Sequence, residues 1–390
     1  MSCLFDFKYI SIKASVAGGF FQEWREIAIE ATRFVEKSRY SNQTLQLIWF
    51  FKPPKDESWH NLQQSIGELE EMKQIKSITQ TFISQPPIGD SQVELIIRYI
   101  NEQTDQLGVQ FKEVKGSQYT CVVSGENCWV VMGGLGCSEG SLEVSGQAKC
   151  VFSELQIVLA KENLGFKHLV RQWNYIENIV GFSHQSDREY QHYQEFNEIR
   201  AEWYSENGLV HDFPAATGIG THGGGVIIEG IAARLDASYK LLPIGNPNQE
   251  NAHSYSRAKL IGTQASSAPL FERGKMIFGN NEGYIWVSGT AAIRGEDSVS
   301  GSISDQTRVI CENIDELISQ SNLKKAGLIM NDFVIKPVYL RAYVKPGQDG
   351  LLVEEFILKR YPDALVHVLY ADICREELLV EVEGEFRVAH

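Results

Sequence analysis

The 390-residue sequence contains no cluster of basic residues and no long apolar run. Lysine and arginine number 36 against 50 aspartate and glutamate, which gives a formal net charge of −14. A chain this acidic disfavours binding to nucleic acid or to an anionic membrane. No apolar stretch approaches the roughly 20 residues that span a membrane, and the segment Met1–Ala17 lacks the apolar core of a signal peptide. We therefore expect a cytoplasmic protein that binds neither nucleic acid nor membrane.

Several common functional motifs are also missing. The seven cysteines are odd in number and show no CxxC spacing, which suits a reducing compartment and argues against a disulfide scaffold or a zinc ribbon. The sequence has no HExxH, no GxSxG and no P-loop lysine, so we expect no metal site and no nucleotide site. Gly218–Gly223 matches GxGxxG, but a β-prone run follows it instead of a helix. This match predicts a glycine-rich turn between two strands.

An internal repeat organises the rest of the chain. Trp129–Gly133 and Ile285–Gly289 are short β-prone runs that end on glycine. Each leads through a polar loop to apolar residues at the three-and-four spacing of one buried helix face. A second strand, a second helix, a proline break and a closing strand that contains an acid follow in both copies. The repeat predicts two units of the order strand–helix–strand–helix–strand–strand.

This order places the protein in the α+β class, with sheets covered on one side by helices. We expect an N-terminal extension over residues 1–118, packed on the first unit. The first unit should cover residues 119–235 and the second unit residues 268–390, and the polar segment 236–267 should supply a linker and functional loops.

Two groups of residues could hold an anionic ligand. Arg171 lies among strand-forming aromatic residues, where it is either a paired structural charge or a clamp for a carboxylate. Tyr193, Phe196 and Arg200 share one face of a helical segment. They could line the pocket of a cyclic carboxylate, or pack as core beside a salt bridge. The pattern alone leaves both alternatives open.

Glu381 is the strongest candidate for chemistry. It lies in the closing strand Leu378–Gly384, on the face opposite an apolar row and between apolar neighbours. The strand could present a solvated polar face. Alternatively, Glu381 is a desolvated carboxyl with a raised pKa, which can act as a general acid near neutral pH.

At these positions the sequence resembles the chorismatases, chorismate-cleaving enzymes built on duplicated Rid/YjgF-like, or chorismate mutase-like, α+β units in a pseudo-symmetric arrangement. The resemblance covers roughly residues 125–235 and 268–385 and adds little over 1–118. The segments that carry it are Arg171–Tyr175, Tyr193–Arg200, Pro214–Gly220, Ser288–Gly295 and Asp372–Glu381.

The resemblance implies a role for each candidate residue. Glu381 matches the glutamate that protonates the methylene of the enolpyruvyl ether, after which pyruvate is lost, and Cys374 would steer the intermediate. The remaining matched positions would bind the substrate, with arginines on its carboxylates and aromatic residues around its ring: Arg171, Tyr193, Phe196, Arg200, Thr217, Gly220, Arg273 and Gly289.

The resemblance also implies a product. Gly289 and Cys374 match the branch that forms 3-hydroxybenzoate, some members of which also yield 4-hydroxybenzoate, whereas the hydrolysing branch has alanine at both positions. No cofactor is implied, and the expected assembly is a monomer or a homotrimer. The alternatives are the hydrolysing reaction, a silent binding protein, or the enamine/imine deaminase activity of Rid proteins. The arginine required for deamination is absent around Ala216 and around His367.

Overall fold

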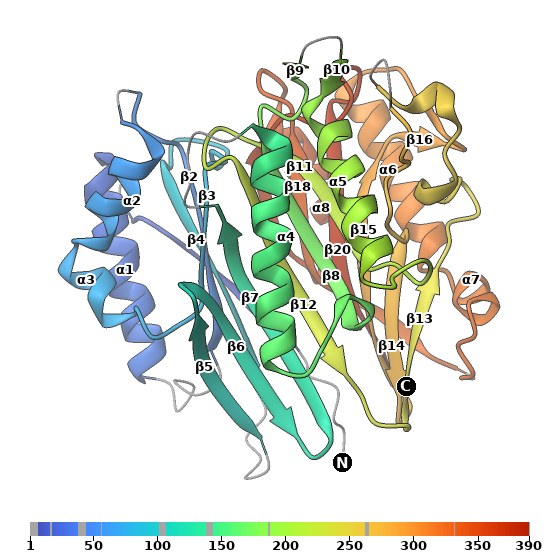
Figure 1. Ribbon diagram of the computed structural model, residues 1–390, viewed down its shortest axis with the longest axis horizontal. Coiled ribbons are helices and arrows are strands. Elements are labelled where there is room, and N and C mark those ends of the chain that lie inside the picture. Colours follow the sequence, from blue (N-terminus) through green and yellow to red (C-terminus); the bar gives the residue numbers. More distant parts are fainter. Residues whose placement is uncertain are drawn as a thin grey trace.

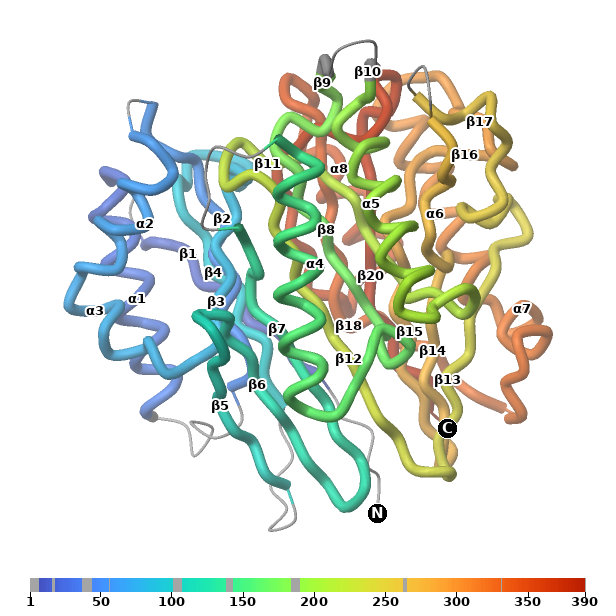
Figure 2. The backbone as a smooth tube through the Cα atoms, in the orientation of Figure 1, coloured from blue at the N-terminus to red at the C-terminus, as the bar shows by residue number. Residues whose placement is uncertain are grey.

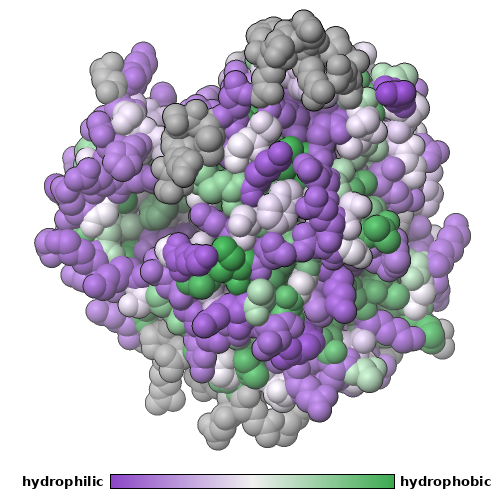
Figure 3. Space-filling model, viewed as in Figure 1, coloured by the Kyte–Doolittle hydropathy of each residue, from purple (hydrophilic) through white to green (hydrophobic). Residues whose placement is uncertain are grey.

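The computed structural model describes residues 7–15, 18–37, 44–55, 57–100, 107–137, 143–185, 188–261, 265–330 and 332–389. Three large sheets lie side by side, with the main helices on their outer faces (Figure 1). Hydrophilic side chains cover most of the face seen in Figure 3, as the acidic composition leads one to expect. Among the described residues, no helix is long and apolar enough to cross a membrane.

The first unit is a six-stranded sheet of order β11-β8-β12-β7-β6-β5. Its strands are β5 (Gly108–Val114), β6 (Ser117–Ser124), β7 (Asn127–Gly136), β8 (Leu169–Glu177), β11 (Ala215–Thr221) and β12 (Val226–Arg234). Helices α4 (Val144–Lys161) and α5 (His192–Glu206) cover one face, and the hairpin β9 (Phe182–Gln185) and β10 (Arg188–Gln191) precedes α5. In α4 the residues Val151, Phe152 and Leu155 are buried, which is the face that the sequence spacing predicts.

The second unit has the same topology, with order β13-β14-β15-β20-β18-β19. Its strands are β13 (Tyr239–Ile244), β14 (Gly274–Gly279), β15 (Glu282–Ala291), β18 (Val334–Val344), β19 (Leu365–Tyr370) and β20 (Val380–Ala389). Its helices are α6 (Ile303–Leu317), α7 (Gln320–Lys325) and α8 (Gly350–Arg360), and the small hairpin β16 (Ile293–Arg294) and β17 (Asp297–Ser298) lies beside them. Ser302 and Asp305 form a capping box that starts α6. The predicted order of elements is therefore present in both units, each preceded by two further strands.

The N-terminal region is a third copy of this arrangement. It contains β1 (Phe7–Lys13), α1 (Phe20–Lys37), β2 (Thr44–Phe51), α2 (Trp59–Gly67), α3 (Glu70–Gln74), β3 (Gln80–Ile83) and β4 (Val93–Ile100). The sheet order β1-β4-β2-β3 repeats the strands β7-β12-β8-β11 of the first unit and β15-β20-β18-β19 of the second, without the two strands at the other end of each sheet, β6 and β5 or β14 and β13. The two outer strands have no counterpart among the described residues of this region. The expected extension is thus a further unit, and the sheets of the first and second units begin at Gly108 and Tyr239, outside the predicted unit boundaries.

The three units form a closed ring. Strand β3 contacts β7, β11 contacts β15, and β19 contacts β1. Strands β3, β11 and β19 occupy the same place in their sheets, and so do β7, β15 and β1. The three interfaces are therefore equivalent, and the path of the chain through the three units can be followed in Figure 2. The protein has pseudo-threefold symmetry within one chain.

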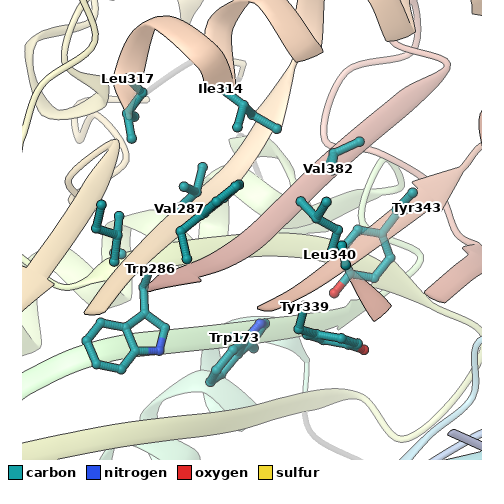
Figure 4. Close-up of a cluster of buried hydrophobic side chains, with 14 of the residues drawn as sticks. Trp173, Trp286, Val287, Ile314, Leu317, Tyr339, Leu340, Tyr343 and Val382 are labelled. Atoms are coloured by element: carbon teal, nitrogen blue, oxygen red, sulfur yellow. The ribbon is translucent and has the colours of Figure 1, made fainter. Parts of the chain in front are cut away.

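The inner faces of the sheets share one core (Figure 4). Rings from all three units meet there: the centroids of Phe7 and Trp129 are 5.9 Å apart, and Trp286 lies 6.2 Å from each. Because helices cover one face and the other sheets cover the opposite face, β8 is buried at every residue except its last. Polar residues on such a strand need buried partners.

Candidate active site

The cleft between the first and second units contains a cavity of about 690 Å³, measured out to its open mouth. The first unit contributes Tyr193, Ala216 and Gly218, and the second contributes Gly289, Cys374 and Glu381. Strand β11 of the first unit runs beside β15 of the second, so residues far apart in the chain face one cavity.

Glu381 lies near the start of β20 and is 4% exposed. Burial raises the pKa of its carboxyl to about 8, and the neighbouring charge of Glu383 adds to this effect. The positive charges of Arg171 and Arg273 act in the opposite direction. The carboxyl is therefore largely protonated at neutral pH, which answers the question that the strand pattern left open: this face of β20 is not solvated.

Gly289 leaves room for the Glu381 carboxyl. A Cβ atom at position 289 would lie 2.0 Å from Oε1 of Glu381 and 3.1 Å from Cγ2 of Thr217. The backbone N–H of Gly289 donates to Oγ1 of Thr217 at 3.0 Å. Any larger residue at this position must displace the acid or the strand that carries it.

Glu383, two residues after Glu381, is held by four donors, of which the hydroxyl of Tyr343 is the most distant at 3.3 Å. Its Oε2 atom accepts from Nη2 of Arg171 and from Oγ1 of Thr217, each at 2.5 Å. Its Oε1 atom accepts from Nε1 of Trp173 at 2.7 Å. The guanidinium of Arg171 also lies 4.5 Å from the centre of the Trp173 ring. Arg171 is thus paired inside the protein, and its position favours a role in placing β20 over direct contact with a ligand.

Positive charge reaches the cavity from two other arginines. Arg273 lies against Tyr255 and donates to its hydroxyl at 2.6 Å and to the backbone oxygen of Glu250 at 2.6 and 3.0 Å. Arg375 donates to Ser298 at 3.0 Å. The guanidinium carbons of Arg273 and Arg375 lie 5.4 and 5.5 Å from the centre of the Tyr255 ring, and both side chains line the cavity. The site can therefore attract an anion despite the net charge of the chain.

Sequence reasoning did not single out Tyr255, Lys259 or Arg375, although all three line the cavity. Arg375 directly follows Cys374 in the most specific matched segment, so that segment contained a usable signal. Tyr255 and Lys259 lie in the stretch predicted to hold functional loops. Nothing in the local pattern shows that these loops fold over the cleft.

Tyr193 and Cys374 shape the apolar part of the wall. The Tyr193 ring packs on Gly218, where a Cβ atom would lie 2.6 Å from its Cε2 atom. Burial raises the pKa of the Cys374 thiol to about 12, with a further contribution from Glu381. The thiol is therefore neutral, so it acts as a small apolar group and weak donor and not as a thiolate nucleophile.

Of the ten predicted site residues, all described, five line the cavity and five lie behind its wall. The lining set is Tyr193, Arg273, Gly289, Cys374 and Glu381. The other five are Arg171, Phe196, Arg200, Thr217 and Gly220.

The residues behind the wall support it. Phe196 is fully buried and its ring centre lies 5.7 Å from that of Phe152. Arg200 donates to Oδ1 of Asn197 at 2.6 Å, and the N–H of Gly220 donates to the backbone oxygen of Asp372 at 2.8 Å. Arg200 thus stabilises the turn of α5 that carries Tyr193, and Gly220 joins β11 to the loop that carries Cys374.

Comparison with known proteins shows which families the chain resembles. Residues 112–232 match the family model described as chorismatase FkbO/Hyg5-like, N-terminal. The chain is 33% identical over 230 residues to a 3-hydroxybenzoate synthase of Streptomyces hygroscopicus, and 34% identical over 226 residues to a chorismatase of Streptomyces rapamycinicus. The resemblance to the chorismatases is confirmed. Each match covers 57% of this chain and 64% of the relative, so the chain spans just under two thirds of the curated relatives that it matches.

The fold agrees over a longer range. A crystal structure of a chorismatase superposes with a TM-score of 0.69 over 99% of both chains, at 22% identity. The α+β class predicted from the sequence is confirmed, and the chorismatase-like fold includes the N-terminal unit, over which the sequence resemblance is weak.

Proposed function

We propose that the protein cleaves chorismate to pyruvate and 3-hydroxybenzoate. The observation that carries the proposal is the buried Glu381, whose pKa is raised to about 8, on the wall of a cavity that arginines also line. The names of the relatives, chorismatase and 3-hydroxybenzoate synthase, support the same substrate.

The charges of the cavity suit this substrate. Chorismate carries two carboxylates, one on its ring and one on the enolpyruvyl group. Arg273 and Arg375, with Lys259 at the same wall, supply cations for both. The rings of Tyr193 and Tyr255 provide flat surfaces against which a cyclohexadiene can pack. Arg171 and Arg200, which lie behind the wall, hold the protein groups that make this surface.

The acid step follows from the protonation state of Glu381. The protonated carboxyl transfers its proton to the methylene carbon of the enol ether, which becomes a methyl group. Positive charge then develops on the adjacent carbon and weakens the ether bond. The oxygen of the ring hydroxyl adds to that carbon in place of water, and its proton passes to the ether oxygen, which stays on the ring as the hydroxyl of the product when the ether bond breaks. The bond between the ring and the attacking oxygen then breaks, which releases pyruvate, and the ring proton that is lost on aromatisation returns to the Glu381 carboxylate. The atoms of chorismic acid divide completely between pyruvic acid and hydroxybenzoic acid, so this route consumes no water.

Gly289 and Cys374 support the water-free route. Gly289 lets the Glu381 carboxyl lie deep against Thr217, and the neutral thiol of Cys374 fills the wall beside it. We expect a water molecule to be excluded from the reacting ether when the acid and the thiol keep these positions. The hydrolysing route, which consumes one water and gives a dihydroxycyclohexadiene carboxylate, is the alternative outcome of the test. We place this activity in the cytoplasm.

The test is incubation of the purified protein with chorismate, without added metal or cofactor, followed by chromatography of the products. We expect pyruvate and 3-hydroxybenzoate in equal amounts. Unchanged chorismate after incubation with folded protein would contradict the proposal. Release of ammonia from an imine substrate, with chorismate untouched, would favour the deaminase alternative.

A further inference from the structure

A second cluster of reactive side chains lies at the outer side of the first unit. Cys121 is on β6, Cys128 is on β7, and Glu162 caps the C-terminal end of α4. One ligand atom from each of the three residues lies within 4.8 Å of the other two. Both cysteines are buried and free, and the Glu162 side chain is 11% exposed. None of these described residues lines the chorismate cavity.

Two of the three distances between the ligand atoms match the edges of a metal tetrahedron. A zinc ion bound at about 2.3 Å from sulfur and about 2.0 Å from oxygen places two sulfurs ~3.8 Å apart, and a sulfur and an oxygen ~3.5 Å apart. In the protein, Sγ of Cys121 lies 3.8 Å from Sγ of Cys128 and 3.6 Å from Oε2 of Glu162. These two separations are those that the ion requires, and the ligand atoms of the third pair, Cys128 and Glu162, lie within 4.8 Å of each other.

Neighbouring groups orient the carboxylate. Oε1 of Glu162 accepts from the hydroxyl of Tyr119 at 2.8 Å and from Nζ of Lys112 at 2.9 Å. Nζ of Lys112 also donates to Oε2 at 3.0 Å, and Oε2 lies 3.6 Å from Sγ of Cys121, so the carboxylate is held beside the thiols in the way that outer hydrogen bonds fix metal-binding carboxylates. A divalent ion with two thiolates and one carboxylate has a net charge of −1, which the ammonium of Lys112 balances.

We propose that Cys121, Cys128 and Glu162 bind one thiophilic divalent cation of the zinc class, with a water molecule as the fourth ligand. On binding, each thiol releases one proton to solvent and Glu162 binds as the carboxylate, so no oxidant or reductant is needed. The ion ties the β6–β7 hairpin to the end of α4. No sequence pattern indicates the site, because the two cysteines are seven positions apart and Glu162 is distant in the chain.

A disulfide between the same cysteines is the competing outcome. In the β6–β7 register, Cys121 pairs with Val130 and Cys128 pairs with Val123. The two cysteines are therefore diagonal neighbours and not a directly opposed pair. This arrangement favours a shared ion over a covalent bond.

The experiment uses the full chain, reduced and stripped of metal with a chelator. Titration with Co²⁺ should give a thiolate-to-cobalt charge-transfer band that saturates at one equivalent, and Zn²⁺ should displace it and raise Tm. Cys121→Ser and Cys128→Ser should abolish the band, and Glu162→Gln should weaken binding at least about tenfold. Cys137→Ser and Cys311→Ser, which change free cysteines elsewhere, should bind like the wild type.

Three results would overturn the proposal. The first is the absence of a saturable band in the folded wild type. The second is a mass two hydrogens lower under non-reducing conditions, which marks a disulfide. The third is unchanged affinity in Glu162→Gln, and this variant decides the question if the serine variants do not fold. None of these readouts depends on chorismate cleavage, so the two proposals can fail separately.

Discussion

Two glutamates on one strand show how the surroundings set the chemistry of a residue. Glu381 and Glu383 both lie on β20 and are both at most 4% exposed. Glu383 accepts hydrogen bonds from Arg171, Thr217 and Trp173, which hold its carboxyl in place. Glu381 faces the cavity, where burial dominates and raises its pKa to about 8. The Glu383 carboxyl thus holds β20 in place, and the Glu381 carboxyl is available as an acid.

Replacing Glu381 by glutamine tests this assignment. Glu381→Gln keeps the size of the side chain but supplies no proton, and we expect kcat to fall by ~10²–10⁴-fold. Chorismate binding should persist, because Arg273 and Arg375 remain. In the wild type, kcat/KM should fall as the pH rises through about 8, because only the protonated carboxyl is active.

Glu355→Gln provides the control for this variant, since Glu355 is exposed on α8. It should leave both kcat and the pH profile unchanged. Wild-type turnover in Glu381→Gln would remove the proposed mechanism.

Gly289→Ala tests the room around the acid. The new Cβ atom would lie 2.0 Å from Oε1 of Glu381, so the carboxyl must move from its present position. We expect slower chorismate consumption, and a shift of product from 3-hydroxybenzoate towards the dihydrodiol acid, because a displaced acid admits water. Cys374→Ala should shift the product ratio in the same direction with a smaller loss of rate. Chromatography of the products measures both effects.

The matched control is Gly67→Ala, because a Cβ atom at position 67 meets no other atom within 4 Å. An unchanged product ratio in both Gly289→Ala and Cys374→Ala would show that neither residue steers the intermediate.

At the scale of the elements, a buried glutamate occupies the same strand position in another cleft, but its pKa is shifted in the opposite direction. Lys13 pairs with Glu94 in the N-terminal sheet as Ala291 pairs with Glu381 in the second unit. Glu94 is also buried, which alone would raise its pKa, but Nε2 of His367 lies 3.0 Å away and Oγ of Ser11 donates to it at 2.5 Å. Together with Lys13, these groups lower the pKa of Glu94 to about 2. Equivalent strands therefore carry a fixed anion in one cleft and a neutral acid in the other.

The recurrence of this strand in the three units also explains which parts of the fold could be predicted from the sequence. The repeat is visible through Trp129–Gly133 and Ile285–Gly289, and β7 and β15 lie there as expected. The third copy escapes detection because β1 has no such glycine: Ser11 fills the space over Glu94 that Gly289 leaves open over Glu381. The N-terminal unit therefore lacks the glycine that marks the other two copies, although it shares their sheet topology.

Glu383→Gln tests how β20 sets the pKa of its acid. The negative charge of Glu383 raises the pKa of Glu381, and Arg171 lowers it. Removing that charge frees Arg171 from its partner, so both changes act in the same direction. We expect the falling limb of the pH profile of kcat/KM to move below its wild-type position near 8, together with a lower kcat at neutral pH.

The pH profile separates this positioning role from a merely structural one. A structural loss would lower the rate equally at every pH and leave the limb in place. That outcome would contradict the electrostatic coupling between the two glutamates.

At the scale of the whole molecule, the site exists only because units from different parts of the chain meet. Sequence reasoning could not decide whether Arg171 was a paired charge or a ligand clamp, because its partner Glu383 lies 212 positions later. Similarly, no local pattern distinguishes the cleft that forms the cavity from the two equivalent clefts. One chain closes the ring of three units, and its first and second units supply described residues that line the cavity.

The ring depends on buried charges as well as on apolar contacts. Arg98 of the N-terminal unit is fully buried, and its Nη1 atom lies 3.1 Å from Oε1 of Glu229 in the first unit. Its Nε atom donates to the hydroxyl of Tyr9 at 2.9 Å, and that hydroxyl donates to Glu385 of the second unit at 2.7 Å. One guanidinium therefore links carboxylates from both other units.

Replacing this guanidinium should destabilise the whole molecule without changing the site. Arg98→Met leaves Glu229 and Glu385 buried without their cation, and breaking a buried pair in this way costs about 3–5 kcal/mol. Urea unfolding at pH 7 should show this loss. Arg360→Met removes an ion pair with Asp315 in which the arginine side chain is 56% exposed, and it should cost less than about 1 kcal/mol.

The KM for chorismate should match the wild type in both folded variants, because neither arginine lines the cavity. Equal stability of the two variants would show that the units are held together by their apolar core, and that the buried charges at the centre contribute no more than a pair at the surface.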